Sequence, residues 1–87
     1  MQVTAKNVAI VLQKLHESEI KTALESHPVY GWAWRVASPY VQGWPTGLHT
    51  TKQGQAAEFV PAVNAMAAAA AEVFPESDFA EWAKQNA

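Results

Sequence analysis

Apolar residues recur at helical spacing near the start of the chain, which predicts an amphipathic helix. The apolar stripe comprises Val8, Val11, Leu12 and Leu15. Residues three or four positions apart share one face of a helix, so this stripe is expected to face the core. Thr4 is a candidate N-cap because its hydroxyl can accept a hydrogen bond from the first turn. The predicted helix therefore begins at Ala5.

The apolar stripe shifts after Leu15. Ile20 and Leu24 lie on a rotated face, so either the helix kinks or Ser18 caps a second short helix. A charge pair at i,i+4 spacing favours a continuous helix. The pair is Glu17 and Lys21. In both interpretations the helix ends before Pro28, because proline pushes the preceding residue out of the α region.

Strict alternation over residues 29–37 predicts a β-strand. The face with large side chains carries Tyr30, Trp32, Trp34 and Val36. The opposite face carries Gly31, Ala33, Arg35 and Ala37. After Ser38-Pro39 the chain can return as a second strand over Val41–Thr51, which glycine and proline make irregular and place at a sheet edge.

Residues 52–55 are polar and are expected to separate that return strand from the next element. The next segment, AEFVPAV over residues 57–63, allows two interpretations. It is either a short third strand, or the first turn of a helix in which Pro61 is tolerated near the start. The strand is preferred here.

Two helices are predicted at the C-terminal end. The alanine-rich run from residue 63 or 64 to Phe74 has high helix propensity, and Pro75 ends it. Ser77 is a candidate N-cap for a last helix over residues 78–86, with Phe79, Trp82 and Ala83 on one face. The predicted fold is α+β: an N-terminal helix, an antiparallel two- or three-stranded sheet, and two C-terminal helices.

Composition narrows the class of protein. The chain has 87 residues, which predicts a single domain, and it contains no cysteine that could form a disulfide. Its formal net charge is −2 and its six basic residues are scattered, so duplex nucleic-acid binding is not expected. Membrane insertion is not expected either, because no apolar run is long enough to span a bilayer. A cytoplasmic protein is the expectation.

The aromatic segment, residues 29–45, allows two interpretations. Its rings either fill the core beneath a helix, which is preferred for Trp32 and Trp34, or stay exposed as a contact surface. Trp, Tyr and Arg often dominate interfaces. The candidate partner-binding residues are therefore Arg35, Tyr40, Trp44, Trp32 and Lys52, with Tyr40 and Trp44 preferred over Trp32 because they lie in or beside a turn. Three acidic residues, Glu76, Asp78 and Glu81, form either a solvated helix face or a docking patch for a basic partner.

The alanine run over residues 67–71 predicts a smooth helix face. Such a face suits close helix contact, either within the fold or across a homodimer, and a homodimer remains open here. Alanine buries little apolar area, so this helix alone anchors a small fold weakly.

No catalytic or cofactor-binding pattern is present. The three histidines, His16, His27 and His49, lack the spacing of a zinc site. Ser26 and His27 are adjacent in sequence, which is not the geometry of a nucleophile and its base, and no G-x-S-x-G elbow occurs. The glycines form neither a P-loop nor a dinucleotide fingerprint. We therefore expect no enzyme, no metal and no cofactor.

Three short motifs in the middle of the chain resemble those of a known group of proteins. They are PVYGWAWRV at 28–36, GW followed by PTG at 43–47, and EFVPAV at 58–63. This layout resembles small accessory proteins of phages and prophages, which share an aromatic strand, a Trp-bearing strand and a closing V-x-P strand. The resemblance covers residues 28–63, about two fifths of the chain. It departs from the pattern at the end of the closing strand, where Ala62-Val63 stands in place of larger side chains.

The resemblance implies a viral or mobile-element origin and carries over no catalytic residue. Small proteins from that source often bind and disable a bacterial protein, such as a defence complex or surface-appendage machinery. Two functional hypotheses follow. The first is a protein-binding inhibitor or adaptor that acts in the bacterial cytoplasm. The second is a single-stranded nucleic-acid binder that stacks bases on Trp and Tyr rings.

Overall fold

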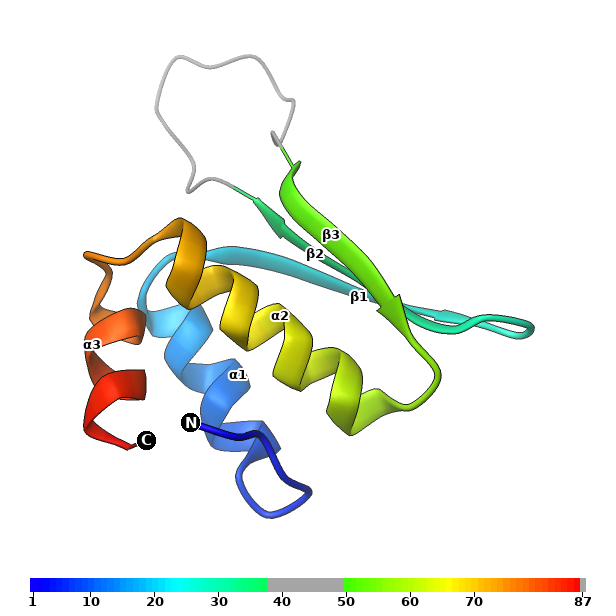
Figure 1. The fold of residues 1–87 in the computed structure, drawn as a ribbon, viewed down its shortest axis with the longest axis horizontal. Helices are drawn as coiled ribbons and strands as arrows, with labels where there is room; N and C mark the ends of the chain where they lie inside the picture. Colours follow the sequence, from blue (N-terminus) through cyan, green and yellow to red (C-terminus); the bar gives the residue numbers. More distant parts are fainter. Residues whose placement is uncertain (38–49, 87) are drawn as a thin grey trace.

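Three antiparallel strands and three helices make up the described part of the chain. The computed structural model describes residues 1–37 and 50–86. In chain order the elements are α1 (Val8–Glu17), β1 (Lys21–His27), β2 (Gly31–Ala37), β3 (Thr50–Ala56), α2 (Phe59–Val73) and α3 (Asp78–Gln85). The sheet has the order β1-β2-β3, and the helices lie together on one of its faces (Figure 1). The predicted α+β arrangement is confirmed, with three strands in the sheet.

The sheet has a covered face and an open face. Trp34 and Val36 of β2 point toward the helices and are buried, whereas Arg35 between them is exposed. The core beneath α2 also contains Leu15, Met66 and Phe79 among its largest buried side chains. Burial of Trp34 confirms the core interpretation for that ring.

Helix α1 begins three residues later than predicted. Asn7, not Thr4, is its N-cap. The side chain of Asn7 instead organises the preceding turn, because Oδ1 accepts from the backbone N of Thr4 at 2.7 Å and Nδ2 donates to the carbonyl of Gln2 at 3.0 Å. The segment is also tied to α2, since the backbone N of Val3 donates to Oδ1 of Asn64 at 2.9 Å. The predicted start at Ala5 is therefore wrong.

Helix α1 ends at Glu17 instead of continuing toward His27. Glu19 takes a left-handed conformation with φ 60°. Its backbone N donates to the carbonyl of His16 at 3.0 Å, and the N of Ile20 donates to the carbonyl of Leu15 at 3.2 Å. These two bonds are the Schellman pattern that ends a helix.

Strand β1 follows this helix end directly. It occupies the segment for which a kinked or second helix was predicted, so both helical alternatives are wrong. Lys21 starts the strand, and Glu17 pairs with Lys14 at 3.9 Å instead. Leu24 lies opposite Trp34 in the sheet, so pairing with β2 explains why this segment is extended.

Strand β3 and the start of α2 differ from the prediction. The expected polar break at residues 52–55 lies within β3, because pairing with β2 supplies its backbone hydrogen bonds. The preferred third strand over residues 57–63 is wrong, and the alternative is confirmed: α2 begins at Phe59 with Pro61 in its first turn. Most of the return strand predicted over residues 41–51 lies outside the described residues.

The two C-terminal helices are confirmed. Helix α2 ends before Pro75, and four of its alanines, Ala62, Ala67, Ala69 and Ala70, are buried within the chain. Ser77 is the N-cap of α3, and its Oγ accepts from the backbone N of Ala80 at 3.1 Å. Phe79 is buried, and its ring centroid lies 5.9 Å from that of the half-buried Trp82. The chain thus forms one small α+β domain.

Candidate functional site

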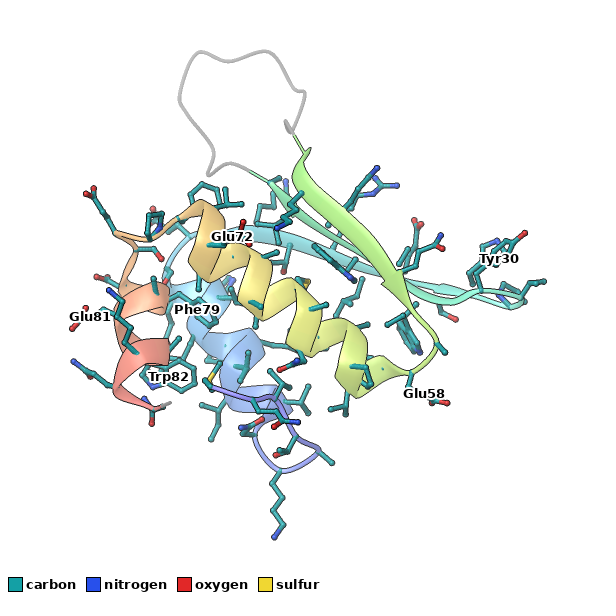
Figure 2. All side chains as sticks on the ribbon, in the orientation of Figure 1. Tyr30, Glu58, Glu72, Phe79, Glu81 and Trp82 are labelled. Atoms are coloured by element: carbon teal, nitrogen blue, oxygen red, sulfur yellow. The ribbon has the colours of Figure 1, made fainter. Side chains whose placement is uncertain are left out.

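The turn between β1 and β2 presents two adjacent large apolar side chains to solvent. Val29 is 78% exposed and Tyr30 is 63% exposed. Among the described residues only one other large apolar side chain is exposed, Ile10 on α1. We call residues 27–30 the hairpin tip. Figure 1 shows this turn extending beyond the ends of β3 and α2, and Figure 2 places Tyr30 at its extremity.

A short connection and a glycine produce the hairpin tip. His27 pairs with Gly31, so only residues 28–30 lie between the paired strands. Gly31 has φ 89°, a conformation that favours glycine and that closes many three-residue hairpin loops. A Cβ at Gly31 would also lie 2.6 Å from the carbonyl oxygens of Ala56 and Ala57. The base of the tip is therefore held close against the β3–α2 connection.

Aromatic packing fixes the base of the hairpin tip on its helix side. The rings of Trp32 and Phe59 meet nearly edge to face, with centroids 4.9 Å apart and an interplanar angle of 65°. Trp32 is half-buried and packs against the core. The exposed pair Val29 and Tyr30 thus follows a hairpin base that is packed against the start of α2.

His27 organises the hairpin tip internally. Its Nδ1 accepts from the backbone N of Val29 and from that of Tyr30, both at 3.3 Å. Its ring also lies against the ring of Tyr30, with centroids 4.7 Å apart and an interplanar angle of 39°. The orientation of Tyr30 is therefore linked to that of His27.

The structure does not bring the predicted partner-binding residues into one cluster. Arg35 lies exposed on the open face of the sheet, and Trp32 lies on the opposite, helix-covered face. Lys52 also lies on the helix side, where its Nζ pairs with Oε2 of Glu72 at 2.8 Å. Tyr40 and Trp44 lie outside the described residues. The role of these five residues in partner binding stays a prediction.

The predicted acidic patch lies at the other end of the molecule from the hairpin tip. Glu76, Asp78 and Glu81 are all exposed. Asp78 and Glu81 are in the first turn of α3, where a negative charge stabilises the helix dipole. Figure 2 places Glu81 and Tyr30 at opposite ends of the molecule, so one small contact surface would not include both.

The open face of the sheet is small and polar in character. A depression on β2 and β3 is lined by Ala33, Trp34, Arg35, Gln53, Gly54 and Gln55; by the register, Trp34 and Gly54 belong to the helix-covered face. No Trp, Tyr or Phe lies on this face within the described parts of β1, β2 and β3. Within these strands the face carries the basic side chains Lys21 and Arg35 and the acidic side chain of Glu25, without rings for stacking.

Metal-ligand clusters and membrane-spanning helices are both absent from the described residues. Across residues 1–37 and 50–86, no group of three or more His, Cys, Asp or Glu side chains is placed to hold a metal ion. None of the helices in the same two ranges combines the length and apolar character that crossing a bilayer requires.

Sequence reasoning missed the hairpin tip as a site. It treated His27-Pro28 as the end of a helix and Tyr30 as one of the strand rings. The signal that could have revealed the tip is the spacing of Pro28 and Gly31, since proline early in a turn and glycine at its end are typical of tight hairpin connections. Comparisons with models of known protein families, with curated proteins and with solved structures found no match.

Proposed function

We propose that this chain is a small protein-binding module that inserts its hairpin tip into an apolar pocket of a bacterial protein. The observation that carries the proposal is the exposure of Val29 and Tyr30, at 78% and 63%, on a projecting hairpin whose base packs against Phe59 through Trp32. Tyrosine is enriched among the residues that dominate interface energies, because it offers a large contact area with few rotatable bonds.

The charges near the hairpin tip indicate the character of the partner. Glu25 is the charged residue of the sheet closest in sequence to the tip, and Glu58 precedes α2 at the same end of the molecule (Figure 2). Both side chains are exposed. A partner pocket with a basic rim would complement these carboxylates and would exclude partners with an acidic rim.

The resemblance of residues 28–63 to phage accessory proteins supports a bacterial host protein as the partner. An inhibitor or adaptor of a defence complex or of surface-appendage machinery is the proposed class, acting in the host cytoplasm. Single-stranded nucleic-acid binding is the alternative. Its support is weaker because Trp34 is buried, Trp32 packs on Phe59, and the described open face carries no Trp, Tyr or Phe.

A capture experiment with matched variants tests the proposal. The immobilised protein is incubated with bacterial lysate and washed at about 0.1 M and about 1 M salt, because high salt screens charge contacts but not apolar ones. The tip variant combines Val29→Ser with Tyr30→Ala. The control is Ile10→Ser, which removes a similarly exposed apolar side chain from α1. All three proteins should melt alike, since exposed substitutions change stability by about 0.5 kcal/mol or less.

The proposal predicts a bacterial protein that the parent and the Ile10→Ser control retain at high salt and the tip variant loses. Equal retention of every captured protein by parent and tip variant would contradict it. Nucleic acid that is retained at low salt and lost at high salt, without a tip-dependent protein, would favour the alternative.

A further inference from the structure

The contacts of His27 resemble those of an Asx turn. In such a turn the side chain of Asn or Asp accepts hydrogen bonds from backbone N–H groups just ahead of it, and thereby holds the turn. Here Nδ1 of His27 accepts from Val29 and Tyr30 at 3.3 Å each. In the hairpin tip, the imidazole of His27 therefore accepts the hydrogen bonds that a carboxamide oxygen accepts in an Asx turn.

Only one protonation state of His27 can make both contacts. Nδ1 accepts when the ring is neutral with its hydrogen on Nε2, and both ring nitrogens become donors when the ring is protonated. A hydrogen on Nδ1 would face the two amide hydrogens of Val29 and Tyr30 and repel them. Ring contact with Tyr30 does not distinguish the states, because a cationic imidazole is also attracted to a tyrosine face.

Charged groups on the His27 side of the sheet are identified by the register. They are Glu25 and Lys21 on β1 and Arg35 on β2, and the neighbouring strand β3 carries Gln55 there. Glu58 directly precedes α2. Imidazole is the type of side chain that ordinarily changes charge between about pH 5 and pH 8.

We propose that His27 is the positioning residue of the hairpin tip: its neutral ring holds Val29 and Tyr30 in the binding conformation, and its protonation releases them. Protonation of His27 should therefore weaken partner binding in acid. This consequence rests on the proposed function, because it follows only if the hairpin tip is the binding site. The conformational statement concerns the free protein and stands on the two Nδ1 contacts alone.

Two variants separate hydrogen bonding from the presence of a ring. His27→Asn places a non-titrating oxygen where Nδ1 lies and keeps an Asx-type acceptor. His27→Phe keeps a ring against Tyr30 and removes the acceptor. Both substitutions are at an exposed position, so all three proteins are expected to fold, and thermal melts check this.

The test is amide hydrogen exchange of Val29 and Tyr30, measured by NMR on the free protein at pH 5 and pH 7.5 and corrected for the intrinsic pH dependence of exchange. In the parent, protection should fall by about threefold to tenfold at the lower pH, as expected for the loss of a modest hydrogen bond. It should change less than about twofold in His27→Asn. It should be low at both pH values in His27→Phe.

Equal protection of the parent at both pH values would overturn the inference, as would the same acid-induced loss in His27→Asn. Neither result depends on a partner, so failure here leaves the proposed function intact. Conversely, failure of the tip variant to lose a captured protein would contradict the proposed function while the exchange data still decide the role of His27.

Discussion

Close packing of Trp34 on Gly54 predicts that Gly54→Ala destabilises the fold. A Cβ on Gly54 would lie 2.6 Å from Cζ2 and 2.8 Å from Cε2 of Trp34, whereas carbon atoms in favourable contact are about 3.5–4.0 Å apart. The indole would therefore have to shift by about 1 Å. Trp34 is only 7% exposed and belongs to the core, so this shift would disturb its packing beneath α2.

The expected loss follows from two opposing effects. Forcing an extra carbon into a packed core costs about 1–3 kcal/mol. Replacing glycine with alanine also restricts the unfolded chain, which offsets about 0.4–1 kcal/mol of that cost. The net destabilisation should be about 1–2 kcal/mol. For a domain of this size that corresponds to a decrease in Tm of roughly 4–16 °C.

Urea denaturation followed by circular dichroism measures this loss, and a double-mutant cycle tests its cause. Trp34→Phe removes the indole edge that the new Cβ would meet, so Gly54→Ala should cost little in that background. Gln53→Ala, on the open face of the same strand, is the control and should change stability by about 0.5 kcal/mol or less. Equal costs of Gly54→Ala in both backgrounds would refute the packing argument.

Three further predictions concern helix ends and a surface ion pair, each measured by urea denaturation. Glu19→Gly should raise the free energy of unfolding by about 0.5–1 kcal/mol, because glycine adopts the left-handed conformation without strain; a loss would contradict the helix-end geometry. Ser77→Ala should lower it by about 1 kcal/mol through loss of the cap to Ala80, and an unchanged midpoint would refute the cap. Lys52→Met should change it by less than about 1 kcal/mol, because the pair with Glu72 is exposed; a larger loss would contradict this.

Elements with their own periodicity could be predicted from the sequence. The alternation of large and small residues identified β2, and Trp34 was placed correctly in the core. Ser77 and Pro75 fixed the ends of the last two helices because their capping and helix-ending roles are local. Local chemistry was sufficient at these positions, but not at the start of α1, where Asn7 and not Thr4 is the N-cap.

Elements that depend on a partner strand could not be predicted. Strand β1 contains Lys21 and Glu25, whose spacing suits a helix face as well as a strand, and its extended form follows from pairing with β2. Strand β3 has no apolar alternation, and its inward-facing position opposite Trp34 is Gly54, where the indole occupies the space that a side chain would need. The hairpin tip was missed for the same reason, since it exists only once β1 is a strand.

The location of the candidate site changes the hypothesis drawn from the rings. Trp34 supports the fold from inside, and Trp32 supports the base of the hairpin through Phe59. Among the described residues, the most exposed large apolar side chains are Val29 and Tyr30 in the turn between β1 and β2. The two described tryptophans therefore serve the fold, and the proposed contact moves to the hairpin tip.

Site-specific photo-crosslinking tests the central claim, that Tyr30 contacts a bacterial protein, most directly. A photoreactive phenylalanine analogue replaces Tyr30 in one protein and Ile10 in another, and both are irradiated in bacterial lysate at high salt. Attachment of one bacterial protein from position 30 and not from position 10 is the predicted result. The absence of any adduct from position 30, or identical adducts from both positions, would contradict the account.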